Sequence, residues 1–167
     1  ETGGKYALVA IDHAIQDIKS GWIDGLVTAP IHKQAMHMAG FNYAGHTDYL
    51  AEKLNSKDHM MMMVGDVMKV GLVTTHIPIK DVPGKITTEK IKKSIQVLNQ
   101  TLKTDFGIDK PLIAILGLNP HASDGGVIGK EDIEVIEPVI SQLKSQGIAC
   151  MGPFSADGFF GAGQYKK

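Results

Sequence analysis

Short, uniformly apolar segments alternate along this chain with longer segments whose apolar residues recur at helical spacing, and this alternation restricts the folds open to it. Residues 111–116, Pro-Leu-Ile-Ala-Ile-Leu, contain no polar side chain, which is typical of a strand buried on both faces of a sheet. Residues 83–107 instead carry Ile91, Ile95 and Leu98, which share one face of a helix. The alternation predicts an α/β fold with a mainly parallel sheet and helices on both faces.

The same reading sets the expected order of elements and the domain organisation. A chain of 167 residues is long enough for one compact domain and short for two. It opens inside a helical segment without an initiator methionine and closes where a further strand is expected, so we interpret residues 1–167 as a single α/β domain or a fragment truncated at both ends. We expect strands at 23–30, 59–66, 67–76, 111–119 and 148–157, and helices at 6–19, 31–40, 45–55, 83–107 and 129–147.

Composition excludes several classes of partner. The chain is 43% hydrophobic and 21% charged, has a formal net charge of −1, and its basic residues are scattered. Nucleic acids and anionic membranes are bound largely through clustered basic side chains, so we expect neither as a partner. A small phosphorylated ligand needs only a local pocket and is not excluded.

The single cysteine, Cys150, excludes an internal disulfide and a zinc–thiolate cluster. Its neighbours are those of a strand, so we predict a buried, inert thiol. No signal peptide opens the chain, and no apolar run approaches the roughly 20 residues that a membrane-spanning helix needs. We therefore expect a cytoplasmic protein.

Polar residues follow several of the expected strands, and in open α/β sheets ligands bind beyond the carboxyl ends of the strands. We therefore expect these side chains to gather along one edge of the sheet. They are Thr28, His32, Lys33, His76, Asp81, Asn119, His121, Asp124, Ser155 and Asp157.

His76 and His121 form the candidate metal pair within this set, because imidazole suits Zn and neighbouring transition metals, and each histidine follows its own strand. A firm site needs at least three protein donors or a chelating substrate. The alternative is that each histidine caps or packs against a turn. On placement alone the two interpretations are about equally supported.

His46 and Thr47 begin the expected helix 45–55. The first turn of a helix offers free N–H groups and a favourable dipole to an anion, so these residues are candidates for binding an anionic substrate. Capping of the helix by either side chain is the simpler alternative, and spacing alone favours it.

Four segments in order, "GLVTAPIHK", "AGHTDYLAE", "TTHIPIKDV" and "LGLNPHASDGGVIGKED", resemble the 4-hydroxythreonine-4-phosphate dehydrogenase family of pyridoxal phosphate biosynthesis. The resemblance implies an isocitrate/isopropylmalate dehydrogenase-like, two-domain enzyme of which this chain is a central fragment. It implies oxidation of 4-phosphohydroxy-L-threonine with NAD or NADP, followed by decarboxylation to 3-amino-2-oxopropyl phosphate. It also implies a homodimer whose divalent metal ion (Zn, Co or Mg) is shared between subunits.

The motifs carry particular residues with them. The resemblance makes His76 of "TTH" and His121 of "NPH" metal ligands, and His46 and Thr47 of "GHT" substrate-binding residues. The family's third histidine ligand belongs to a "YHDQG" segment of the partner subunit, which is not part of this sequence. Ser123 stands where the family's common "NPHAGE" has glycine, and an aspartate follows in place of glutamate.

Two other hypotheses about the function remain open. One is the related group of dehydrogenases that act on four-carbon sugar-acid phosphates, threonate or erythronate 4-phosphate. The other is a non-catalytic α/β fragment that serves for dimerisation or binding. Because the third histidine is absent, we expect the 167-residue chain alone to be inactive.

Overall fold

The computed structural model describes residues 2–166. The chain forms two compact units, residues 1–59 and residues 60–167, which meet in sequence between His59 and Met60. Of the described helices, none is long and apolar enough to span a membrane. That the chain is one α/β domain or a fragment of a larger protein stays a prediction.

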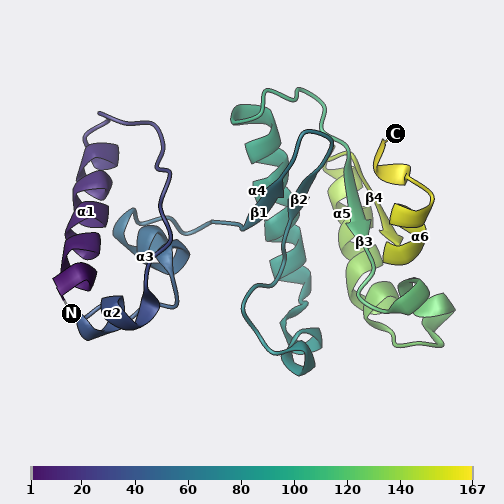
Figure 1. Cartoon of the computed structure of the whole chain (residues 1–167). Helices are drawn as coiled ribbons and strands as arrows, with labels where there is room; N and C mark the ends of the chain where they lie inside the picture. Colours follow the sequence, from purple (N-terminus) through teal and green to yellow (C-terminus); the bar gives the residue numbers. More distant parts are fainter. Residues whose placement is uncertain (1, 167) are drawn as a thin grey trace. The chain divides into compact units, whose positions relative to one another are not determined.

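The described regular elements of the first unit are all helices, α1 (Thr2–Lys19), α2 (Lys33–Met38) and α3 (His46–Lys53), coloured purple to blue in Figure 1. All three confirm expected helices. Ile15 of α1 and Met36 of α2 are buried together with Tyr49 of α3. The Tyr49 hydroxyl also donates a hydrogen bond to the Asp12 carboxylate, which joins α3 to α1.

The strand expected at 23–30 does not form. These residues run as irregular chain, and Val27 is 99% exposed. A strand satisfies its backbone N–H and C=O groups by pairing with a neighbour, and no described residue pairs with this segment. The segment therefore has the apolar composition of a strand but lacks the neighbouring strand with which to pair.

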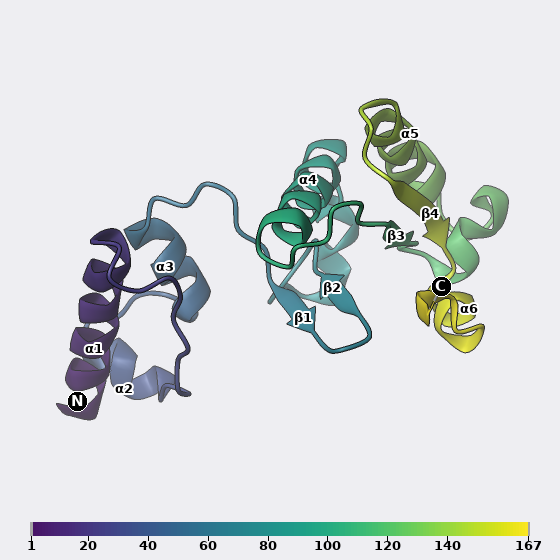
Figure 2. The same ribbon diagram turned by 90° about the horizontal axis from the view of Figure 1, so that it is seen from above.

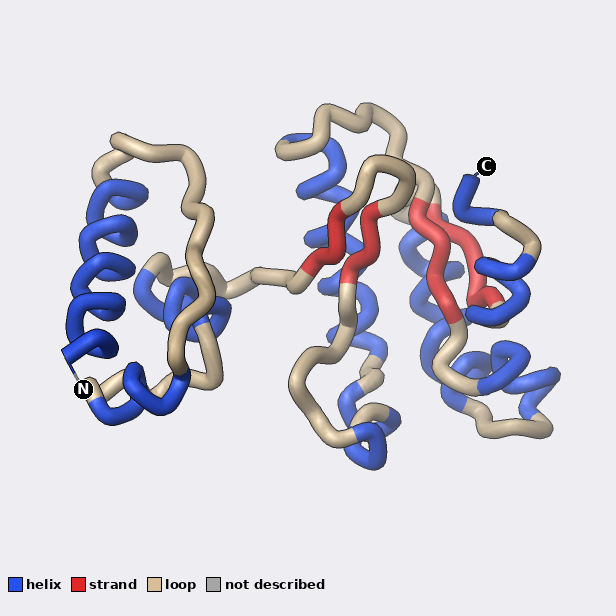
Figure 3. Tube along the Cα trace, in the orientation of Figure 1, coloured by secondary structure: helices blue, strands red, loops and turns tan. Residues whose placement is uncertain are grey.

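The second unit holds all of the described strands. Figure 3 shows the four strands in red among the helices, which are blue. The helices and strands are β1 (Met62–Val64), β2 (Lys69–Gly71), α4 (Thr88–Thr104), β3 (Ile113–Leu116), α5 (Glu137–Ser145), β4 (Cys150–Phe154) and α6 (Ala156–Gly161). The shorter turns are Ile79–Asp81, Pro83–Lys85, Pro120–Gly126 and Gln164–Lys166, and a π-helical turn, Asp132–Ile136, precedes α5.

The strands form two pairs of opposite sense. β3 and β4 are parallel, with Ile113 opposite Cys150, and the chain crosses between them through α5, which lies beside β4 in Figures 1 and 2. β1 and β2 are antiparallel, with Met62 opposite Gly71. Only residues 65–68 separate β1 from β2, which is too short for the crossover that a parallel pair requires. The α/β fold class is confirmed, but the strands expected at 59–66 and 67–76 form a separate antiparallel pair and do not join the parallel one.

The core of this unit lies between α4, α5 and the strands. The apolar face of α4 is buried as its sequence predicts, and Leu143 of α5 is 0% exposed. Thr87 caps α4 by accepting a hydrogen bond from the Lys90 N–H at 3.2 Å. Cys150 is buried, as expected, and burial raises the pKa of its thiol.

We expect Leu143→Ala to lower the free energy of unfolding by about 2–5 kcal/mol, because it removes a fully buried side chain and leaves a cavity. Urea unfolding followed by circular dichroism measures this loss. Ile79→Ala, at a site 90% exposed, is the control and should change stability by less than about 0.5 kcal/mol. Equal effects of the two substitutions would contradict the placement of the core.

Candidate functional site

The turn that follows β3 has an unusual backbone. His121, Ala122, Ser123, Asp124 and Gly125 all have positive φ angles, between 44° and 70°. Four of these five residues have a side chain, and each non-glycine residue in left-handed conformation costs roughly 1–2 kcal/mol. The turn Pro120–Gly126 must therefore be held by interactions with its surroundings.

The carboxylate of Asp132 supplies three of these interactions. Asp132 is 0% exposed and lies in the π-helical turn before α5. Its Oδ1 accepts a hydrogen bond from the Leu118 N–H at 2.7 Å, and its Oδ2 accepts from the Asn119 N–H at 3.1 Å and from the Ser123 hydroxyl at 2.6 Å. Three donors thus compensate the removal of this carboxylate from water.

Asn119 extends the network to a second carboxylate. Its side-chain amide donates to the Ser123 Oγ at 3.1 Å and to the Glu131 Oε2 at 2.8 Å. The pKa of Glu131 is lowered, chiefly by a hydrogen bond from its own backbone N–H and then by the Asn119 amide. The residues around the turn therefore form one connected set of hydrogen bonds.

Two glycines make room for this network. A Cβ at Gly117 would lie 2.9 Å from the Cα of Ala122 and 3.0 Å from the Asp132 Oδ1. A Cβ at Gly129, where φ is +92°, would lie 2.6 Å from the Asn119 Nδ2. The end of β3 and the exit of the turn thus approach the network too closely to accept a side chain.

His121 is exposed on this turn and lies near α6. The pKa of Asp157, in the first turn of α6, is lowered mainly by the hydrogen bond from the Ser155 hydroxyl and in smaller part by the charge of His121. Two of the groups expected at the strand ends, those after β3 and after β4, are therefore neighbours.

His76 follows β2, which belongs to the antiparallel pair. It lies five positions beyond Gly71, as His121 lies five beyond Leu116, and both histidines are exposed and have a φ of 54°. Within residues 2–166, no group of three or more His, Cys, Asp or Glu side chains is arranged to hold a metal ion. The two histidines therefore share their distance along the chain from a strand, their exposure and their φ angle.

The first unit places His46 as the first residue of α3, half-buried, with Thr47 exposed beside it. The N-cap position of α3 is Gly45, which has no side chain, so the alternative in which His46 or Thr47 caps α3 is wrong. Capping occurs instead at His32, whose Nδ1 accepts from the Ala35 N–H at 3.1 Å in α2. His32 therefore has a structural role at this position.

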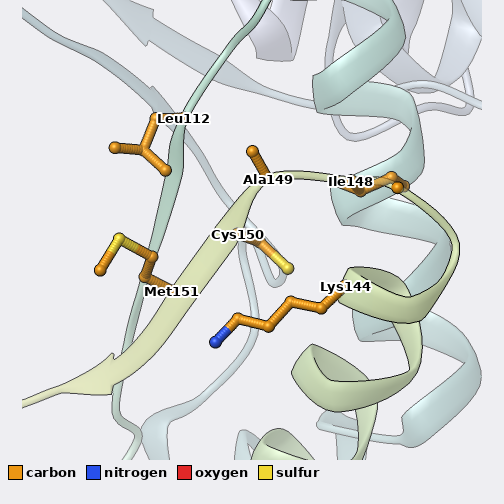
Figure 4. Close-up of a pocket in the computed structure, with 7 residues that line it drawn as sticks. Leu112, Lys144, Ile148, Ala149, Cys150 and Met151 are labelled. Atoms are coloured by element: carbon orange, nitrogen blue, oxygen red, sulfur yellow. The ribbon is translucent and has the colours of Figure 1, made fainter.

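Two hollows open on the second unit. The larger, of about 930 Å³, is lined mainly by apolar residues of β2, α4, β3 and α6. The smaller, of about 360 Å³, lies where α5 passes into β4, and Figure 4 shows the Lys144 side chain extending toward β4 there. The lining of neither hollow includes His76 or His121.

Sequence reasoning missed Asp132 and the role of Ser123. In "GKEDIEVIE" an acidic pair before a helix is typical of residues that favour the helix N-terminus, and nothing local indicates that one of the two is buried. Asn119 was expected near the ligand edge, and it lies at the centre of the network.

A family model and curated relatives both match this chain over nearly its whole length. The family model described as "Pyridoxal phosphate biosynthetic protein PdxA" matches residues 1–167. The 4-hydroxythreonine-4-phosphate dehydrogenase of Sulfurihydrogenibium sp. is 48% identical over 157 residues, 94% of this chain and 49% of that protein. That of Bacteroides thetaiotaomicron is 44% identical over 163 residues, 97% of this chain and 45% of that protein. The chain spans about half the length of the curated relatives it matches.

Solved structures show the same likeness. The 4-hydroxythreonine-4-phosphate dehydrogenase of Klebsiella pneumoniae superposes with a TM-score of 0.89 at 31% identity, over 98% of this chain and 48% of that one. A terephthalate 1,2-cis-dihydrodiol dehydrogenase from Burkholderia xenovorans superposes with a TM-score of 0.72 at 26% identity, over 92% and 49%. The fold is therefore shared with dehydrogenases named for different substrates.

We expect Gly129→Ala to destabilise the second unit by at least about 1–2 kcal/mol, because alanine resists the left-handed backbone and its methyl group collides with the Asn119 amide. Urea unfolding of the two proteins measures the difference. Gly84→Ala serves as control, since a methyl group added there would meet no atom within 4 Å. Undiminished stability of Gly129→Ala would mean that the turn does not have this geometry.

Proposed function

This chain belongs to the family of the pyridoxal phosphate biosynthetic protein PdxA, and we propose from this premise that it supplies part of the active site of a 4-hydroxythreonine-4-phosphate dehydrogenase. The reaction is the oxidation of 4-phosphohydroxy-L-threonine with NAD or NADP, followed by decarboxylation to 3-amino-2-oxopropyl phosphate. The observation that carries the proposal is the match of the family model to all 167 residues.

We propose His76 and His121 as two ligands of a divalent metal ion, Zn, Co or Mg. Their support is that each is exposed and follows a strand, β2 or β3, by five residues, and that imidazole suits such ions. Two donors are fewer than a firm site requires, so the set fits a site completed by a further histidine from a partner subunit. A bound divalent ion would polarise the substrate hydroxyl and stabilise negative charge during decarboxylation.

In this proposal the residues around His121 hold its imidazole in place for metal binding. The network of Asp132, Asn119 and Ser123 holds the turn, so the imidazole is presented from a fixed backbone. Asp157 lies close enough to His121 to be affected by its charge, and it adds a carboxylate to the same edge. Such preorganisation lowers the cost of assembling the site when substrate arrives.

We propose that His46 and Thr47 bind an anionic group of the substrate. They begin α3, whose N-cap Gly45 has no side chain to bond the first-turn N–H groups, and these groups favour negative charge. The phosphate and carboxylate of the proposed substrate both have the required charge. The enzyme is proposed to act as a homodimer, and the isolated 167-residue chain to be inactive.

Substrate choice is the point at which this function is most sharply tested. Because the fold is shared with a dehydrogenase named for a terephthalate dihydrodiol, fold alone does not select the substrate. We expect the full-length protein to reduce NAD or NADP with 4-phosphohydroxy-L-threonine and to require a divalent ion, as followed by absorbance of the reduced cofactor. A higher kcat/KM for threonate or erythronate 4-phosphate would replace the leading assignment with the sugar-acid phosphate activity.

We expect His76→Ala and His121→Ala in the full-length protein each to lower kcat/KM by at least about 100-fold, because several kcal/mol of charge stabilisation are lost with the ion. Metal content by mass spectrometry should fall in parallel. His59→Ala, an exposed histidine outside the proposed site, is the matched control and should leave both unchanged. Full activity and metal content in either test variant would remove that histidine from the ligand set.

A further inference from the structure

We propose that Asp132 is a positioning residue for His121. Its buried carboxylate holds the left-handed turn Pro120–Gly126 and thereby fixes the position of the His121 imidazole. The inference rests on the proposed function for the role of His121, and on the described hydrogen bonds for the role of Asp132. In this proposal Asp132 contacts neither metal nor substrate and acts on His121 through the Leu118 and Asn119 N–H groups and the Ser123 hydroxyl.

The hydrogen bonds to Asp132 bracket His121 on both sides. Leu118 and Asn119 donate their N–H groups just before the turn, and Ser123 donates its hydroxyl just after His121. Backbone bonds close the exit, from the Ile128 N–H to the Ser123 C=O at 3.0 Å. The same carboxylate therefore binds backbone N–H groups before His121 and a side-chain hydroxyl after it.

That carboxylate is itself anchored to the core. Asp132 opens the π-helical turn Asp132–Ile136, and Ile136 is buried with Val139 and Leu143 of α5. π-helical turns widen a helix locally and occur often at functional sites. The position of the exposed His121 is thus tied through Asp132 to the packing of α5 against α4.

Ser123 adopts the left-handed backbone conformation although it is not a glycine, and its side chain helps to stabilise that conformation. Its φ is 70° and its side chain is 0% exposed, where a glycine would adopt the same backbone with less strain but would donate no hydrogen bond. The serine hydroxyl offsets the strain by binding Asp132. Two substitutions at this position therefore separate the two effects. Ser123→Ala removes the hydroxyl and keeps the backbone strain, whereas Ser123→Gly removes both.

The test uses the full-length protein with Co²⁺ as the only added metal, since its visible absorption reports ligand geometry. We expect Asp132→Asn to weaken Co²⁺ binding by about 10- to 100-fold, as is usual when a residue that orients a ligand is lost, and to change the spectrum. Ser123→Ala should weaken binding as well, whereas Ser123→Gly should retain more of the affinity because glycine accepts the positive φ.

A general loss of stability is separated from positioning by Val139→Ala. Val139 is 1% exposed in α5 and touches none of the hydrogen bonds of the turn, so this variant should lower Tm while leaving Co²⁺ affinity and spectrum unchanged. Wild-type affinity and spectrum in Asp132→Asn would overturn the proposal. So would an equal loss in Val139→Ala at the same drop in Tm.

The NMR signals of the His121 ring in the metal-free protein give a readout that does not depend on the ligand assignment. We expect Asp132→Asn and Ser123→Ala to shift these signals and Val139→Ala to leave them in place. If His121→Ala leaves Co²⁺ binding unchanged, the ligand assignment in the proposed function fails, and the ring signals alone decide the positioning role. Unshifted ring signals in both turn variants would overturn that role.

Discussion

A carboxylate without access to water is stable only when protein donors replace the water that it loses, and Asp132 finds three of them on the chain that leaves β3. This arrangement joins elements that are distant in sequence: the strand end, the turn that carries His121, and the helix whose apolar face closes the core. The left-handed turn is possible because the donors and the acceptor are brought together by packing. Stability and the presentation of a candidate ligand therefore depend on the same few bonds.

The helices and most strands of this chain are predictable because their information is local. The apolar spacing of α4, its Thr87 cap and the apolar run of β3 each specify their element without reference to the rest of the molecule. Residues 23–30 fail as a strand because pairing requires a partner, which local sequence does not encode. The antiparallel sense of β1 and β2 follows from the short connection between them, a length that the sequence does show.

In the candidate site, too, some features are predictable from local sequence and others depend on tertiary structure. Histidines placed after strands are visible in the sequence, and in the structure His76 and His121 each follow a strand by the same number of residues and have the same φ angle. The left-handed backbone was not foreseen, because Pro-His-Ala-Ser-Asp lacks the glycines that normally mark it. Asp132 was missed because burial of one acidic residue beside an exposed lysine and a hydrogen-bonded glutamate is a tertiary effect.

The close approach at Gly117 has a consequence for how such a chain can change over evolutionary time. The missing side chain at this position leaves space that Ala122 and the Asp132 Oδ1 share, while the Ser123 hydroxyl donates to the other oxygen of the same carboxylate. A substitution at any of these positions alters the space or the bonding available to the others. These positions are therefore expected to behave as one epistatic group, in which a change that is harmful alone is tolerated only after a compensating change at a neighbour.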